Sequence, residues 1–434
     1  MGPNVFFLNT FINHKPASKA LRGFAMENFM SNQLDHRQLA DEMEIYFLNE
    51  EIGAGLPVWL PNGVAIRDAL EAYIKKLEQR DGYQRVASPH VAKASLYEAS
   101  GHLRAFQENM FPPMRWPEDN SHYYLKPMNC PHHHKVFSSS LRSYRQLPLR
   151  IAEYGQVYRY ENSGALKGLS RVRGLCQNDA HIYVDPKEAF SEISKVLDLH
   201  EECYAALNLK GYRYRLSKHD PQRMKDFDGA SELWQESEEI LRQCLLQKGL
   251  PFFEAEGEAA FYGPKIDVQM KMGSGDEESI ASVQLDFNSA DKFDLNYVSN
   301  SGQNQRPWII HRAPLGSHER FVALLLEYYQ GQLPGWLSPV QVYLIPLNEE
   351  QHSHAQALAQ KLRAQDIRVL VDHNSGSLSK RILFAHKLRP FSKIVLGAKE
   401  LEAQEVRLQM RDGKEHKVAL QDLEKFLKGV SAMP

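Results

Sequence analysis

The 434-residue sequence is poor in cysteine and has no long apolar run. Its four cysteines, Cys130, Cys176, Cys203 and Cys244, show no spacing typical of a disulfide framework, and a chain of this length does not need one. No apolar stretch reaches the roughly 18 residues of a membrane-spanning helix. We therefore expect a protein of the reducing cytoplasm without a membrane partner.

The sequence also lacks an excess of either charge. Its 52 Lys and Arg balance 54 Asp and Glu, so the whole chain gives no indication of a nucleic-acid partner. From Leu337 onward, however, Lys and Arg outnumber Asp and Glu, whereas the preceding part is acidic. A modestly basic C-terminal part suits a phosphate backbone, although chance variation explains it equally well.

Acidic residues are absent from the first 26 residues, which carry Lys15, Lys19 and Arg22. This composition weakly resembles an organelle transit peptide. We favour the other interpretation, in which translation begins at Met26 or Met30. Residues 1–34 are accordingly treated as an N-terminal extension or an over-called start.

Internal repeats and low-complexity tracts are absent, and the periodicity predicts ordinary helices and strands. Residues 35–51 have helical periodicity, and a Pro-Asn-Gly turn at 61–63 should precede a second helix and a strand ending at Pro89. Further helices are expected at 189–209, 230–248 and 320–331. Strands are expected at both ends of 149–183, at 261–272 and at 279–287.

A change of pattern falls near Trp336 to Pro339. Beyond it, strands at 340–347, 367–372 and 393–397 alternate with helical segments, which predicts a small α/β domain with parallel pairing. The domain bounds are therefore placed at 35–336 and 337–434.

No phosphate-binding loop of the form GxxxxGK[ST] occurs, but five other words are informative. RIAEYGQVYRYE (150–161) and GSHERF (316–321) resemble motifs 2 and 3 of the class II aminoacyl-tRNA synthetases. KPMNCP (126–131), DAHI (179–182) and IHRA (310–313) narrow the resemblance to the threonyl-tRNA synthetases, from about Asp35 to the C-terminus. It implies an α+β fold: a catalytic domain built on an antiparallel sheet, followed by a small α/β anticodon-binding domain. The segment ending at Pro89 resembles motif 1, which implies a homodimer.

Three residues in these words, Cys130, His181 and His311, form a set of one thiolate and two imidazoles that leaves a position open on Zn²⁺. The resemblance implies that one Zn²⁺ per protomer reads the amino and hydroxyl groups of threonine. An apolar pocket would separate threonine from valine by only about a hundredfold. Singly, each of these residues is more often structural. The histidine run 132–134 offers a rival metal tract, which we interpret as a substitution beside the site.

The threonine pocket is predicted around Asp179, which lies two residues before His181 and therefore on the same face of a strand. Asp179 can accept a hydrogen bond from the substrate hydroxyl, and Gln177 on that face can hold the amino group. The resemblance adds four residues to the pocket, two of them also with catalytic roles: Met128, Tyr262, Lys265 and Gln284.

For ATP, the resemblance assigns four side chains. Arg159 bridges the carboxylate and the α-phosphate, Glu161 reads the adenine amino group, Arg171 binds phosphate, and Arg320 stacks on adenine. Mg²⁺ is expected with ATP. The family has phenylalanine where this chain has Leu175, which predicts a one-sided adenine stack and weaker ATP binding.

Transfer to tRNA requires the terminal ribose hydroxyl to lose its proton. His102 matches a histidine proposed to help in this step with Gln284, a role that suits a pKa near 7. A histidine that merely forms structural hydrogen bonds is the alternative.

The leading prediction is a threonine–tRNA ligase that uses L-threonine, ATP and tRNA-Thr. The chain is expected to be a short form without N-terminal editing domains, so that seryl-tRNA is corrected in trans or tolerated. Among anticodon-reading positions Glu400 is kept, but Ser375 and Gln409 depart. A paralogue that serves another acceptor or resists an inhibitor, and a catalytically dead tRNA-binding protein, remain as alternatives.

Overall fold

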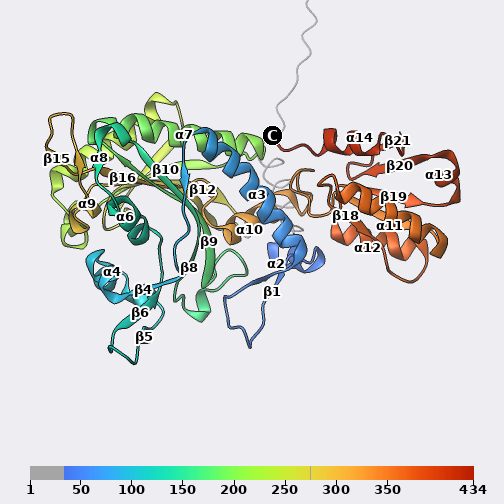
Figure 1. Ribbon diagram of the computed structural model, residues 1–434, viewed down its shortest axis with the longest axis horizontal. Coiled ribbons are helices and arrows are strands. Elements are labelled where there is room, and N and C mark those ends of the chain that lie inside the picture. The colour runs from blue at the N-terminus through green and yellow to red at the C-terminus, as the bar shows by residue number, and fades with distance from the viewer. Residues whose placement is uncertain (1–33, 274) are drawn as a thin grey trace, which may run out of the picture.

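The computed structural model describes residues 34–273 and 275–434, which form a large lobe and a smaller C-terminal lobe (Figure 1). All but the last residue of the expected N-terminal extension, 1–34, lies outside the described residues. One apolar core extends to Leu337, and separate cores begin at Val340 and Val342. None of the helices in the described part of the chain is long and apolar enough to span a bilayer.

An eight-stranded sheet forms the centre of the large lobe, in the order β11-β10-β12-β13-β16-β9-β8-β3. Its inner strands are antiparallel, and only the outermost pairs, β10 with β11 and β3 with β8, are parallel. In chain order the strands are β3 (Gln84–Arg85), β8 (Leu149–Tyr158), β9 (Gly174–Val184), β10 (Arg213–Lys218), β11 (Phe252–Glu256), β12 (Lys265–Lys271), β13 (Glu277–Asp286) and β16 (Trp308–Ala313). The sheet confirms the expected α+β architecture.

Four longer helices contribute apolar side chains to the core on one face of this sheet. They are α3 (Pro61–Arg80), α7 (Ala189–Ala206), α8 (Ser231–Gln247) and α10 (His318–Tyr329). Alternate strand residues such as Ile182, Val283 and Ile310 point into that core. Their neighbours along each strand therefore point to the opposite face.

The opposite face carries α6 (Cys130–Ser138), whose Phe137 stacks on Tyr183 of β9. Shorter elements complete the lobe. They are α2 (His36–Glu42), β1 (Tyr46–Phe47), β2 (Val58–Trp59), β4 (Val91–Lys93), α4 (Ala94–Ala99), α5 (His102–Ala105), β5 (Met114–Arg115), β6 (His122–Leu125), β7 (Arg142–Ser143), α9 (Ser289–Lys292), β14 (Tyr297–Val298) and β15 (Asn304–Gln305).

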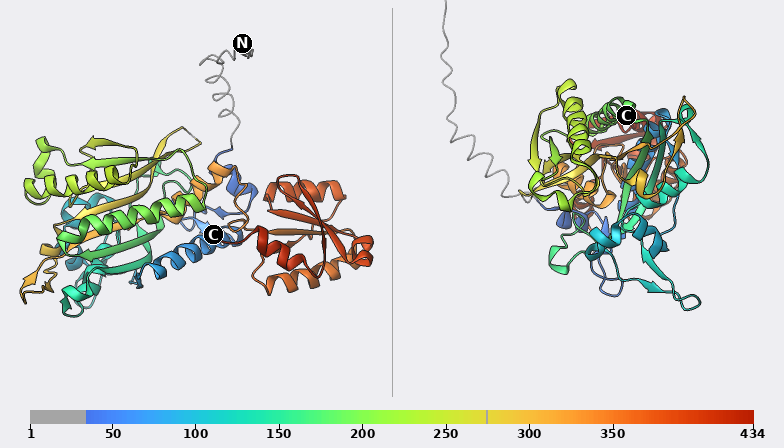
Figure 2. Two further views of the ribbon diagram at one scale, coloured as in Figure 1. Left: turned by 90° about the horizontal axis from the view of Figure 1, so that it is seen from above. Right: turned by 90° about the vertical axis from the view of Figure 1, so that its left-hand side faces the viewer.

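The C-terminal lobe is a five-stranded sheet in the order β18-β17-β19-β20-β21. The three expected strands pair in parallel, and two antiparallel strands that were not predicted follow them. Its elements are β17 (Val342–Pro346), α11 (Glu349–Arg363), β18 (Val369–Val371), α12 (Leu378–Leu388), β19 (Ser392–Leu396), α13 (Ala398–Ala403), β20 (Glu405–Met410), β21 (Glu415–Ala419) and α14 (Leu423–Val430). Figure 2 shows this lobe beside the end of the large lobe.

Polar contacts fix the junction between the lobes. Arg368 donates hydrogen bonds to the carbonyl oxygens of Trp336 and Ser338, at 2.7 and 2.9 Å. Arg389 forms an ion pair of 2.7 Å with Glu42 of α2. These contacts join the C-terminal lobe to the connecting segment and to α2 of the large lobe.

The predictions for 35–51 and 61–63 were wrong. The helix expected over 35–51 ends at Glu42, and Tyr46–Phe47 within the same stretch form strand β1. The Pro-Asn-Gly segment 61–63 is the first turn of α3 rather than a turn before it. Proline is well suited to a first helical turn because its missing N–H would have no partner there. A Cβ on Gly63 would lie 2.2 Å from the carbonyl oxygen of Ile45, so the glycine is needed for close packing of the helix start.

Candidate active site

A cavity of about 320 Å³ opens on the face of the sheet opposite the long helices. It brings together the predicted metal ligands, all six residues of the predicted threonine pocket and Arg159. The residues from these predictions that line it are Met128, Cys130, Arg159, Gln177, Asp179, His181, Tyr262, Lys265, Gln284 and His311.

The register of the sheet explains why residues so distant in sequence meet here. Lys265 of β12 pairs with Gln284 of β13, Gln284 pairs with His311 of β16, and His311 pairs with His181 of β9. Directly opposed residues of neighbouring strands point to the same face. These four side chains therefore form one row across the floor of the cavity, with Cys130 supplied by the start of α6.

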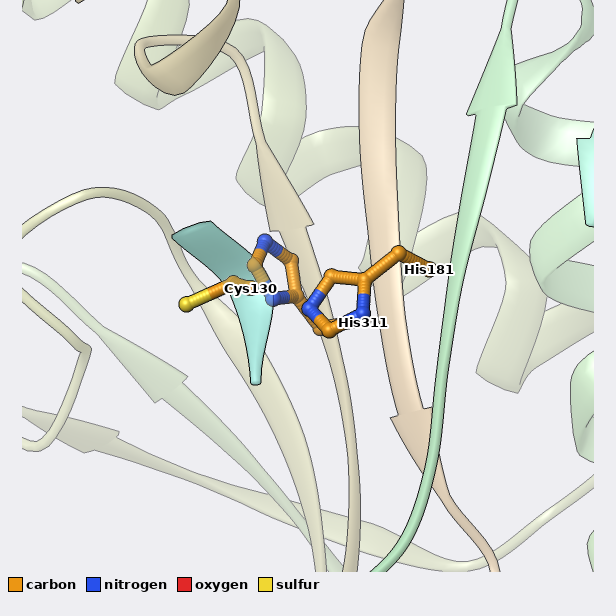
Figure 3. Close-up of side chains that lie close together, drawn as sticks. All are labelled: Cys130, His181 and His311. Atoms are coloured by element: carbon orange, nitrogen blue, oxygen red, sulfur yellow. The ribbon is translucent and has the colours of Figure 1, made fainter. Parts of the chain in front are cut away.

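The thiol of Cys130 and the rings of His181 and His311 lie close together (Figure 3), and all three residues line the cavity. One ligand atom from each lies within 4.8 Å of the others. The two rings meet edge to face, with centres 4.4 Å apart. Three converging soft and borderline donors suit Zn²⁺.

Hydrogen bonds decide which ring nitrogen of each histidine is available to a metal. Nε2 of His311 lies 3.0 Å from a carboxylate oxygen of Asp286, and Nδ1 of His181 lies 2.8 Å from Nδ1 of His133. Nδ1 of His311 and Nε2 of His181 therefore remain available as metal ligands. Metal-binding histidines in proteins usually have such a partner on the second ring nitrogen.

The electrostatics also fit a cation. Burial, together with the charges of Asp179 and Asp286, raises the pKa of the Cys130 thiol well above its ordinary value. Burial lowers the pKa of His181 far below its ordinary value, which keeps the ring neutral. A Zn²⁺ ion would compensate the thiolate and use the free lone pair of the neutral ring.

The residues predicted to read the substrate lie beside this set. Gln177, Asp179 and His181 alternate along β9 and share its cavity face, as expected from their spacing. Asn129 donates a hydrogen bond of 2.9 Å to Oδ2 of Asp179, and Oδ1 lies 3.9 Å from Nδ1 of His181. The Asp179 carboxylate is thus held in one orientation.

Tyr262 and Gln284 are joined across the same cavity. The Tyr262 hydroxyl donates to Oε1 of Gln284 at 2.5 Å, and its ring stacks on His311 with centres 5.2 Å apart. Tyr262 was expected on a strand, but it lies in the turn before β12. Lys265 is paired with Asp267 at 2.9 Å.

Arg159 follows the last residue of β8 and reaches into the cavity. Burial, and secondarily the charge of Arg320, lowers its pKa. Across residues 34–273 and 275–434 no carboxylate lies within ion-pair distance of its guanidinium. Within the described residues, the guanidinium makes a single hydrogen bond, from Nε to the carbonyl oxygen of Pro127 at 3.5 Å. A cation in this setting is prepared for an anionic ligand.

The other predicted ATP residues surround the cavity without lining it. Arg171 and Glu161 form an ion pair of 2.9 Å with each other. Arg320 belongs to the first turn of α10 and donates to the carbonyl oxygens of Ser170 and Ser279. The backbones of the β8–β9 loop and of β13 thereby position its planar guanidinium.

His102 differs from the expectation in one respect. Burial, then the charges of Lys292 and Arg159, lowers its pKa to about 4 rather than leaving it near 7. Its Nδ1 is bonded to the Ser100 hydroxyl at 2.7 Å, and its Nε2 has no hydrogen-bond partner among the described residues. The ring is therefore a neutral and weak base in this state, and its role in transfer stays a prediction.

Sequence reasoning missed four residues that support the site: Asn129, His133, Glu153 and Asp286. Burial alone would raise the pKa of Glu153, but the hydrogen bonds of His133 and Ser88 and the charge of Lys126 hold it at about 2. Asp286 had a usable signal, because it shares a strand face with Gln284 two residues earlier. The partners of Glu153 come from distant segments and left no local pattern.

Leu175 lies on the same face of β9 as Gln177 and packs with Val157 and Val172. Replacing Leu175 with phenylalanine should lower the KM for ATP by about two- to tenfold, because a ring stacked on adenine adds about 0.5–1.5 kcal/mol. Leu175→Met is the matched control, since it keeps the volume without a ring. Initial rates at varied ATP concentration test this, and an unchanged KM in the phenylalanine variant would refute the one-sided stack.

Comparisons with known proteins agree with this arrangement. A model described as the class II core domain of tRNA synthetases (G, H, P, S and T) matches residues 114–329, and an anticodon-binding domain model matches residues 341–429. A solved structure titled as the RNA-binding domain of threonyl-tRNA synthetase from Cryptosporidium parvum Iowa II superposes with a TM-score of 0.86. It is 33% identical and covers 92% of this chain and 99% of its own.

The chain belongs to the threonyl-tRNA synthetase family of class II. A putative threonyl-tRNA synthetase from Aeropyrum pernix also resembles it, with a TM-score of 0.78, 30% identity, and coverage of 92% and 98% of the two chains. The threonine–tRNA ligase of Streptococcus sanguinis is 42% identical over 93% of this chain. The chain spans 63% of the length of that family member.

Proposed function

We propose that this chain is a threonine–tRNA ligase, which activates L-threonine with ATP and transfers it to tRNA-Thr. The observation that carries the proposal is the cavity in which Cys130, His181 and His311 adjoin Asp179 and Gln177, with Arg159 at its side. This combination provides for an amino group, a hydroxyl group and a carboxylate within one small space.

In the first step the threonine carboxylate attacks the α-phosphorus of ATP, and pyrophosphate leaves. Negative charge accumulates on the phosphate oxygens, and Arg159 can stabilise it, because the other cations that line the cavity, Lys265 and Arg312, are paired with carboxylates. Mg²⁺ enters with ATP. Arg320 supports the adenine, and Arg171 and Glu161 would exchange their mutual ion pair for contacts with the nucleotide.

For recognition of threonine, Cys130, His181 and His311 would hold Zn²⁺, which would act as a Lewis acid toward the amino and hydroxyl groups of the substrate. Asp179 accepts a hydrogen bond from the hydroxyl, because Asn129 already occupies only one of its oxygens. Gln177 holds the amino group. Met128 and Tyr262 shape the cavity.

Transfer requires tRNA, and the C-terminal lobe offers two hollows at the predicted anticodon-reading positions. Ser375 lines one together with His373 and Arg381, and Glu400 and Gln409 line the other.

A homodimer through the region of α3 and β3 completes the proposal, and sedimentation equilibrium tests it.

Two assays run side by side test the function. Threonine-dependent exchange of pyrophosphate into ATP reports the first step, and charging of tRNA-Thr with labelled threonine reports both. We expect both activities. Exchange without charging would instead favour a paralogue that serves another acceptor, and the absence of both would favour a tRNA-binding protein without catalysis.

The three predicted zinc ligands and Asp179 also predict how efficiently the protein activates amino acids other than threonine. Serine has the amino and hydroxyl groups and lacks one methyl, so we expect its activation to be about 10- to 200-fold less efficient than that of threonine. Valine lacks the hydroxyl and leaves Asp179 unpaired, so its activation should be about 10⁴-fold less efficient or worse. Pyrophosphate exchange with each amino acid measures both ratios.

Equal rejection of serine and valine would contradict this account, because it would remove the hydroxyl as the discriminating group. The expectation that this chain does not hydrolyse seryl-tRNA-Thr stays a prediction. Incubating the isolated ester with the protein and comparing its loss with the spontaneous rate tests it.

A further inference from the structure

A buried chain of hydrogen bonds runs from Lys126 to the predicted metal ligand His181. Nζ of Lys126 lies 3.3 Å from Oε1 of Glu153, and Oε2 of Glu153 lies 3.0 Å from Nε2 of His133. Nδ1 of His133 then lies 2.8 Å from Nδ1 of His181. Lys126 and His133 are fully buried, and Glu153 is 5% exposed.

Only one placement of protons along this chain leaves His181 ready for a metal. The Glu153 carboxylate can only accept, so Nε2 of His133 carries the proton that points to it. A neutral His133 then has a bare Nδ1, which accepts a hydrogen bond from Nδ1–H of His181. A neutral His181 with its proton on Nδ1 has a lone pair on Nε2.

We propose that His133 and Glu153 are positioning residues that fix the tautomer of His181 and so set the zinc affinity of the site. This inference rests on the proposed zinc-dependent reading of threonine. It differs from the arrangement at His311, where Asp286 is bonded directly to the ring. At His181 a second histidine transmits the preference of the carboxylate.

The surroundings of Glu153 leave only one possible direction for its hydrogen bond with His133. Its Oε1 accepts from the backbone N–H of Ser88 at 2.8 Å and lies near Lys126, while Ser88 Oγ donates to Oε2 at 2.8 Å. The backbone donor of Ser88 cannot be reversed. The Glu153 side chain is therefore surrounded by donors, and His133 must donate to it as well.

Glu153→Gln tests this with almost no change of shape. The amide oxygen must face the Ser88 N–H, so the amide NH₂ faces His133 and forces its Nε2 to accept. The proton of His133 then moves to Nδ1, and that of His181 moves to Nε2, where it blocks the metal. We expect zinc to bind about 10- to 100-fold more weakly, measured by competition with a chelator.

Tyr183→Phe is the matched control. The Tyr183 hydroxyl lies 2.8 Å from Nδ1 of His134, a buried histidine whose ring centre is 5.9 Å from that of His181. The variant also removes one buried hydrogen bond near the site, but no partner of a ligand ring. Its zinc affinity should stay within about threefold of the wild type, well below the usual effect of a ligand's partner.

A second pair of variants separates tautomer control from packing. His133→Leu and His133→Asn introduce side chains of similar size, and only asparagine offers an acceptor near the position of Nδ1. Zinc should bind about 10- to 100-fold more weakly to the leucine variant, and asparagine should restore most of the affinity. A purely structural role of His133 would make the two variants alike.

Melting of the metal-free proteins and equilibrium binding of ATP show whether each variant is folded. Wild-type zinc affinity in Glu153→Gln, or equal affinities in the two His133 variants, would overturn the inference alone. Wild-type protein that activates threonine without bound zinc would instead overturn the zinc part of the proposed function. The two failures are therefore distinguishable.

Discussion

Replacing Arg159 with alanine is expected to slow threonyl-adenylate formation by at least about 100-fold, the usual loss when one group that stabilises transition-state charge is removed. The Arg159 guanidinium lines the cavity, and no carboxylate in the described part of the chain is paired with it. Its charge is thus available for the reacting phosphate. Threonine-dependent pyrophosphate exchange, measured at saturating ATP and threonine, tests this.

Arg159→Lys should retain part of the rate, because it keeps the charge but loses the planar fork. Arg171→Ala is the matched control: it also removes an arginine of the β8–β9 region, but one that is half exposed and paired with Glu161. We expect a smaller loss, mainly in the KM for ATP. An alanine variant of Arg159 with more than a tenth of the wild-type rate would remove it from the reacting centre.

The strands that carry the site were predictable because their sequences alternate over many residues. β8 and β9, and likewise β12 and β13, are 7 to 11 residues long, so the period of two is visible without a structure. β3, expected as a full strand ending at Pro89, has only two residues. Two residues contain no period, and only their pairing with β8 defines them.

The residues of the site that lie within long motifs could be predicted from the sequence. Those that are brought together only by the fold could not. Cys130, His181 and His311 lie within such motifs, and the register of β9 and β16 places the two histidines directly opposite each other. His133 looked like one member of a histidine run. Its partner Glu153 lies on another element, and their contact at 3.0 Å depends on how α6 packs over the sheet.

The low pKa of His102 likewise could not be predicted from the sequence. The sequence identifies a histidine in a suitable word, but the pKa of the ring depends on burial and on nearby cations. Lys292 and Arg159, which help to lower the pKa, come from segments that no local pattern connects to His102. Bound tRNA phosphates would add negative charge near the ring, which favours its protonated form.

Loss of the metal should be the second large effect. Cys130→Ala removes the one anionic donor of the predicted set, so we expect zinc to fall from about one ion per protomer to near zero. Threonine activation should fall by at least about 100-fold, because both the amino and the hydroxyl group lose a partner. Elemental analysis after gel filtration and pyrophosphate exchange measure the two effects.

Cys244→Ala is the matched control, because it removes the same atom from a fully buried thiol of α8, outside the cavity. Its zinc content should equal that of the wild type. Both variants should bind ATP, since the adenine and phosphate residues do not depend on the metal for their position. Zinc at one ion per protomer in Cys130→Ala would contradict the ligand set. Full threonine activation without zinc would contradict its role in reading the substrate, because the hydroxyl would then be recognised by Asp179 alone.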